Sequence, residues 1–146
     1  MRRARDESGA AMVEFVSLVV ILVIPLAYLL LTVFEVQRAS FAASSAVREA
    51  ARMFVTAPSS GEGEVRAHQA VALTLADHGM AAEPDSLMIS CAVDPCLTPA
   101  ASVRVEFRTQ VMLPLVPGFV ADVVPVSVSV QAAHTQIVDR YAAIRP

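Results

Sequence analysis

The sequence predicts an α+β protein with a long N-terminal transmembrane helix, a short second helix and a small three-stranded antiparallel sheet. Two observations predict this fold. The 20 residues Phe15–Phe34 contain no charged side chain, and apolar residues alternate with polar ones in three segments after residue 86. A helix rises about 1.5 Å per residue, so about 20 apolar residues cross the hydrocarbon core of a bilayer. The chain therefore predicts a membrane anchor followed by a folded domain.

The helical pattern continues beyond the apolar span. Residues 35–56 hold no Gly or Pro, and small residues such as Ala43 and Ala50 recur seven positions apart. A seam of small residues lets a second backbone approach closely. We therefore expect one helix over Ala10–Ala57, with a bend at Pro25, because its ring removes a backbone hydrogen bond.

A second helix is predicted after a Pro-Ser-Ser-Gly break. Ser59 and Glu62 fit the S-x-x-E capping box, in which the Ser side chain satisfies an amide of the first turn. The apolar periodicity runs to about His78, and Gly79 supplies a stop because it tolerates the left-handed conformation.

Three segments alternate apolar and polar residues, namely Leu87–Val93, Val103–Val111 and Val126–Gln131. This period predicts an antiparallel sheet with one face against a helix and the other in water. The connection Leu113–Val124 is nearly all apolar but is broken by Pro and Gly. It either covers the sheet as local core or exposes a contact patch for a partner or the membrane surface.

Cys91 and Cys96 are the two cysteines of the chain. An even number in an extracytoplasmic domain favours a disulfide, which would close a short loop at the end of a hairpin. The alternatives are unpaired thiols, a redox pair or a metal pair. A metal pair needs two further ligands, and the three histidines show no ligand spacing. We therefore expect no metal and no cofactor.

The composition argues against two classes of function. The net charge is −3, and all 11 basic side chains are Arg, so no basic excess indicates nucleic-acid binding. The sequence also lacks a Gly-rich phosphate loop, zinc-ligand spacing and a nucleophile elbow. We expect neither an enzyme nor a protein that binds a small-molecule substrate.

The start of the apolar stretch carries the most informative residues. A tail with Arg2, Arg3 and Arg5 ends at Gly9, and the carboxylate of Glu14 follows inside the apolar stretch. An ionised carboxylate in a bilayer costs several kcal/mol, so such residues usually have a partner. Cleavage after Gly9 would create an α-amino group on Ala10, one helical turn from Glu14. In the alternative interpretation, Glu14 lies at headgroup depth and is simply solvated.

These elements resemble the processing site of type IV prepilins. The segment Gly9–Phe15, GAAMVEF, is especially similar to the TadE/TadF-like pseudopilins of tight-adherence (Flp-type) pilus systems. The resemblance implies cleavage between Gly9 and Ala10 by a prepilin peptidase, and a role for Glu14 in assembly. It implies a cleaved leader (residues 1–9), a transmembrane and extended helix (10–57) and an extracytoplasmic α+β domain (58–146).

The expected function is that of a minor pseudopilin, a structural component of a tight-adherence pilus or a related secretion system. Its expected partners are the lipid bilayer, the prepilin peptidase and sibling pseudopilins with their pilus or secretion machinery. We expect a single-pass protein with a cytoplasmic N-terminus, because positive charge precedes the span. The alternatives are a membrane-anchored extracytoplasmic binding or sensor domain and, third, an anchored enzyme.

Overall fold

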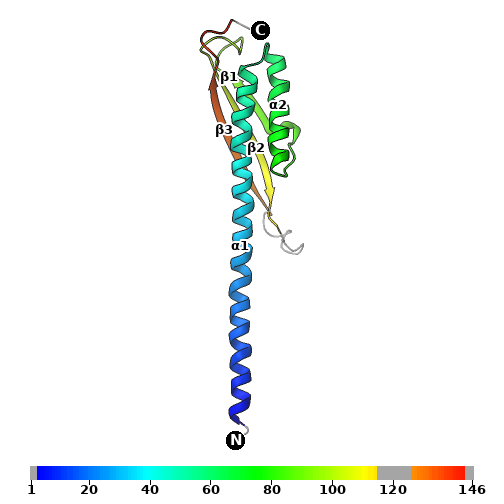
Figure 1. Cartoon of the computed structure of the whole chain (residues 1–146), viewed down its shortest axis with the longest axis vertical. Coiled ribbons are helices and arrows are strands. Elements are labelled where there is room, and N and C mark those ends of the chain that lie inside the picture. The colour runs from blue at the N-terminus through cyan, green and yellow to red at the C-terminus, as the bar shows by residue number, and fades with distance from the viewer. Residues whose placement is uncertain (1–2, 115–125, 144–146) are drawn as a thin grey trace. The chain divides into compact units, whose positions relative to one another are not determined.

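The computed structural model describes residues 3–114 and 126–143, with side chains from residue 9 onward except at Pro84. It confirms the α+β prediction of a long helix, a short helix and a three-stranded antiparallel sheet (Figure 1). The elements in chain order are helix α1 (Arg3–Val55), helix α2 (Ser60–Asp77), the 3₁₀ helix η1 (Pro84–Ser86) and strands β1 (Leu87–Cys91), β2 (Ser102–Met112) and β3 (Ser127–Ile137).

Helix α1 is 53 residues long and runs without interruption through Pro25. It begins at Arg3, earlier than the predicted start at Ala10. The extra residues include Arg, Ala and Glu, which favour helix, and one Gly costs only about 1 kcal/mol relative to Ala. The chain forms two compact units, which meet in the sequence between Phe34 and Glu35. Residues of α1 from Glu35 onward therefore belong to the folded domain.

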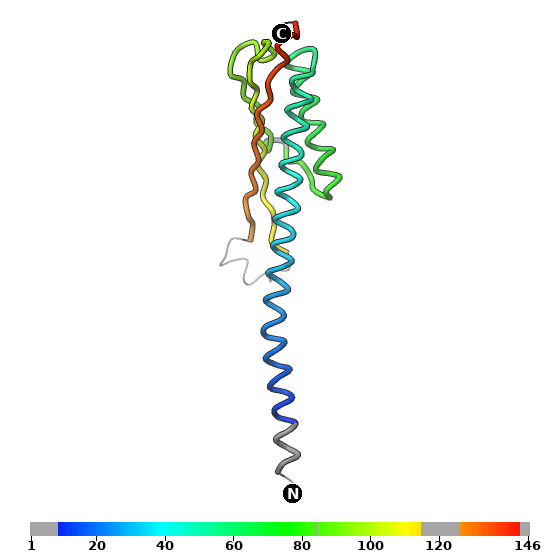
Figure 2. The backbone as a smooth tube through the Cα atoms, turned by 60° about the vertical axis from the view of Figure 1, so that its left-hand side comes forward, coloured from blue at the N-terminus to red at the C-terminus, as the bar shows by residue number. Residues whose placement is uncertain are grey.

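Within the Glu35–Pro146 unit, the sheet lies on one side and both helices lie on the other (Figure 2). The buried face of α1 is rich in small residues, and Ala43, Val47 and Ala50 lie at its centre. Ser40 is exposed and donates a hydrogen bond to the Val36 carbonyl. The buried face is wider than a narrow seam, because side chains of α2 and of the sheet join the same core cluster.

Helix α2 begins and ends as the sequence predicts. The Ser59 hydroxyl accepts a hydrogen bond from the Glu62 amide at 3.3 Å, while the Glu62 carboxylate pairs with Arg66. At the other end Gly79 has φ +68°, the left-handed conformation that favours glycine. Gly63 lies against α1, since a Cβ there would be 3.0 Å from the Phe54 carbonyl oxygen. A glycine at this position lets the two backbones approach closely.

The sheet has the order β1-β2-β3, and both pairs of neighbouring strands are antiparallel. Alternate residues of β2 face the helices and are fully buried, namely Val103, Val105 and Phe107. They pack with Leu75 of α2 and with the small face of α1. The opposite face of the sheet carries no helix in the described part of the chain.

Strand β3 extends six residues beyond the predicted Gln131. The extension includes Ala132 and Ala133, which have low strand propensity, but every residue of β3 pairs with β2. The Leu113 amide still donates to the Val126 carbonyl at 2.7 Å. Most of the predicted connection Leu113–Val124 lies outside the described residues, so the choice between core cover and contact patch stays a prediction.

Candidate processing and assembly site

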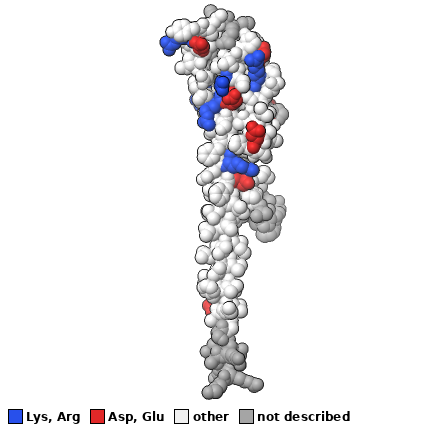
Figure 3. All heavy atoms as spheres, viewed as in Figure 1, with Lys and Arg blue, Asp and Glu red and all other residues white. Residues whose placement is uncertain are grey.

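Helix α1 contains one stretch, Gly9–Val55, that is long and apolar enough to cross a membrane. Its most apolar window has a mean hydropathy of 2.8, and none of that window is buried. The side chains are large and exposed, for example Ile21 at 73 % and Phe15 at 68 %. Figure 3 shows a long stretch of α1 with almost no charged side chains, and Phe15–Phe34 contains none. Water is a poor solvent for such a surface, whereas lipid solvates it without a free-energy cost.

Gly9 lies inside α1, and nothing in the described structure requires a glycine there. A Cβ built at this position would meet no atom within 4 Å, and its φ lies outside the left-handed range. Gly in a helix is about 1 kcal/mol less favourable than Ala. The packing of the described residues therefore gives no reason for Gly9.

Glu14 is exposed on α1, among apolar side chains. None of the described side chains forms a hydrogen bond or an ion pair with its carboxylate. Ala10 and Glu14 are four residues apart, so both lie on one face of the helix, about 6 Å apart along its axis. In the uncut chain the Ala10 nitrogen belongs to a neutral peptide group. The structure thus places the two residues on one face, and only cleavage would supply the positive charge.

Pro25 lies in the middle of the apolar stretch. It has no amide hydrogen, so the Ile21 carbonyl lacks its usual donor four residues later. The helix continues through this position. The predicted bend at Pro25 stays a prediction.

Cys91 and Cys96 form a disulfide, with their Cα atoms 5.2 Å apart. The bridge joins the end of β1 to the loop that leads toward β2. This confirms the predicted pairing over unpaired thiols. The described residues contain no group of three or more acidic, His or Cys side chains that could hold a metal ion.

Replacing both cysteines by Ser should leave the fold intact but lower its melting temperature. The disulfide closes a short loop, and the chain-entropy model gives about 2 kcal/mol of stabilisation for a loop of this length. Thermal unfolding followed by circular dichroism, with and without reductant, measures the difference. Reductant should shift the native protein and leave the double variant unchanged. An equal melting temperature for both proteins would contradict the prediction.

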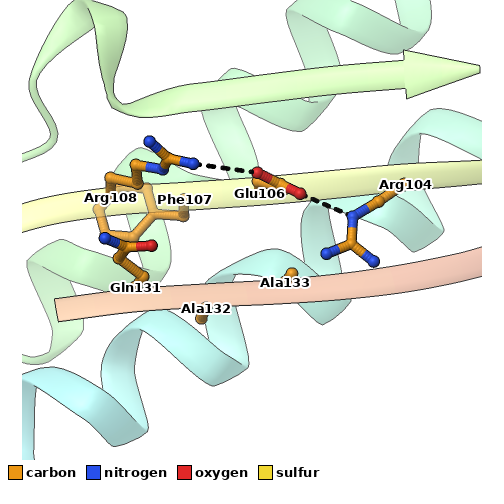
Figure 4. Close-up of a pocket in the computed structure, with 7 residues that line it drawn as sticks. All are labelled: Arg104, Glu106, Phe107, Arg108, Gln131, Ala132 and Ala133. Atoms are coloured by element: carbon orange, nitrogen blue, oxygen red, sulfur yellow. Dashed lines mark hydrogen bonds and ion pairs between the residues drawn. The ribbon is translucent and has the colours of Figure 1, made fainter.

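The outer face of the sheet carries a charged row that the sequence analysis did not single out. Arg104 donates through Nε to Glu106 Oε1 at 2.6 Å, and Arg108 Nη2 lies 3.6 Å from Glu106 Oε2 (Figure 4). These contacts hold the pKa of the Glu106 carboxyl below its usual range, mainly through the Arg104 hydrogen bond and charge. The spacing R-x-E-x-R on a strand could have revealed the row, because alternate residues share a face.

The row borders a hollow whose other wall is formed by Gln131, Ala132 and Ala133 of β3. His134 lies further along β3, half-buried, with Nε2 3.3 Å from the Gln136 amide oxygen. No catalytic arrangement of acid, base and nucleophile comes together in this hollow among the described residues.

Comparison with protein-family models, with curated proteins and with solved structures finds no match to this chain.

Proposed function

We propose that this protein is a minor pseudopilin, a structural component of a tight-adherence (Flp-type) pilus or a related secretion system. The observation that carries the proposal is the order of residues at the start of the apolar stretch. A basic tail is followed by Gly9, then by Glu14 and then by an uncharged span. The absence of any packing reason for Gly9 and the lack of a partner for Glu14 among the described side chains support it.

In this proposal the tail faces the cytoplasm and a membrane-embedded prepilin peptidase cuts between Gly9 and Ala10. The new amine of Ala10 neutralises Glu14 of a neighbouring subunit, so that the carboxylate is paired only in the assembly. The domain from Glu35 onward then lies outside the cytoplasm. Its disulfide supports this location, because disulfides persist in oxidising compartments.

The folded domain suits a minor component of such a system. Major Flp pilins are typically shorter and lack a sheet domain, whereas the described part of this chain carries α2 and three strands. The sheet domain offers surfaces for sibling pseudopilins that a bare helix would not. The partners are therefore the bilayer, the peptidase and those siblings.

The native protein should begin at Ala10 when it is isolated from cells that contain a prepilin peptidase. The reason is that the peptide bond after Gly9 is the proposed cleavage site. Intact-mass measurement and N-terminal sequencing of membrane-extracted protein decide the point. Protein from a peptidase-deficient strain is the control and should keep Met1–Gly9. A chain that keeps this leader in both strains would overturn the proposal.

A further inference from the structure

The outer edge of β3 is an open row of backbone hydrogen-bonding groups. Two hydrogen bonds fix which groups face outward. Leu113 donates to the Val126 carbonyl, and Val138 donates to the Ala101 carbonyl. Hydrogen-bonded pairs alternate along an antiparallel ladder, so the even-numbered residues of β3, from Val128 to Gln136, bond to β2.

The six odd-numbered residues of β3 then direct their amides and carbonyls away from the sheet. They are Ser127, Ser129, Gln131, Ala133, Thr135 and Ile137. In the described part of the chain, no backbone hydrogen bond reaches this edge. A strand edge of this length is a template for pairing with another extended segment.

Strand β3 itself lacks the residues that usually protect an edge strand. It contains no charged residue, no Pro and no Gly over its 11 residues. Natural sheets block such edges with Lys, Pro, bulges or very short strands. The other edge strand, β1, has only five residues and ends in the disulfide. The exposed edge of β3 is thus the one suited to strand addition.

The charged row on β2 indicates which side chains an added strand should carry. Arg108 pairs with Gln131 across the ladder, and Arg104 pairs with Thr135. The side chains of Arg108 and Arg104 are more than half exposed, at 61 % and 54 %, and they share the single carboxylate of Glu106. Each guanidinium has five N–H donors, so the pair presents a net positive charge with many donors still directed to solvent.

We propose that the outer edge of β3 receives an extended segment of a partner protein that carries two acidic side chains four residues apart. A strand added to β3 lies about 10 Å from β2, because neighbouring strands are about 4.8 Å apart. An Arg and a Glu side chain together span that distance across β3, past Gln131 and Thr135. The two carboxylates would then lie opposite Gln131 and Thr135, and would face Arg108 and Arg104.

A second copy of this chain is a poorer occupant of the edge. Neither edge strand, LMISC or SVSVQAAHTQI, contains an acidic residue to meet the arginines.

The probe is a blocked synthetic peptide, TVEVTVEVT, with both Glu residues on one face. Its binding to the full chain in zwitterionic micelles is followed by changes in backbone amide signals. The amides of odd-numbered β3 residues should shift most. The matched TVQVTVQVT peptide should bind more weakly, by up to about tenfold, because exposed ion pairs contribute modestly. Added salt should remove that difference.

Two controls separate charge from strand pairing. In the Arg104→Gln/Arg108→Gln variant, the Glu peptide should lose its advantage over the Gln peptide. A Glu peptide that is N-methylated on the residues of the Glu face should not bind, because the amides of those residues would donate hydrogen bonds to β3. A Glu peptide that is N-methylated on its valines should still bind. The proposal is overturned if the Glu peptide still binds more tightly than the Gln peptide to the Arg variant. It is also overturned if both N-methylated peptides bind equally well, or if crosslinks join two copies of this chain through β3.

Discussion

Replacing Gly9 by Phe is expected to leave the chain uncut while α1 still forms and inserts. The position is open, with no atom within 4 Å of a built Cβ, so a larger side chain meets no described neighbour in this protein. Phe also has a better helix propensity than Gly. The block must therefore arise in the peptidase, which has to admit the backbone on both sides of the bond it cuts.

The expected size of the effect is a fall in the processing rate of at least about tenfold, which corresponds to about 1.4 kcal/mol in the transition state. Pulse labelling followed by intact-mass analysis measures the rate. The Gly9→Ala variant is the matched control, because it adds a single methyl group and should still be cut faster than Gly9→Phe. If Gly9→Phe matures at the native rate, Gly9 is not read by the peptidase and the cleavage site is wrong.

The elements that sequence reasoning predicted well are those with strong local signals. The prediction of the second helix rested on a capping Ser, on apolar spacing and on Gly79. Each of these signals acts within a few residues. Strand β2 alternates regularly, so its buried face could be assigned to Val103, Val105 and Phe107. The disulfide followed from the number and spacing of the cysteines.

The parts that were missed depend on contacts across the chain. Ala132 and Ala133 enter β3 because β2 extends beside them, which local propensity does not indicate. The open edge of β3 depends on which strands are neighbours and on hydrogen-bond register, and neither property is encoded locally. The candidate processing site, in contrast, was predicted from local sequence. Gly9 and Glu14 were found from sequence, and the described structure adds only that packing does not explain them.

Replacing Glu14 by Gln is expected to abolish assembly while leaving insertion and cleavage intact. Insertion scales assign about 2.5–3.5 kcal/mol to an acidic residue at the centre of a span, so a neutral residue inserts at least as well. In the proposed function cleavage depends on Gly9, so it should continue. The variant would lose the proposed ion pair with the Ala10 amine of a neighbouring subunit, and crosslinking to the proposed sibling pseudopilins should fall at least about tenfold.

The matched control is Glu35→Gln, which removes a carboxylate just beyond the uncharged span. Glu35 pairs with Arg38 at 2.7 Å, and an exposed pair of this kind contributes at most about 1 kcal/mol. This variant should insert, be cut and assemble like the native protein. If the Glu14→Gln chain also assembles and supports pili at native levels, Glu14 is only a carboxylate solvated at headgroup depth. An ion pair between Glu14 and the Ala10 amine of the same chain is a second alternative, because the two residues share a helix face. Loss of a pair within one chain would leave crosslinking between subunits unchanged. A loss of crosslinking in Glu14→Gln alone, with membrane fraction and mature mass preserved, therefore assigns the carboxylate to contacts between subunits.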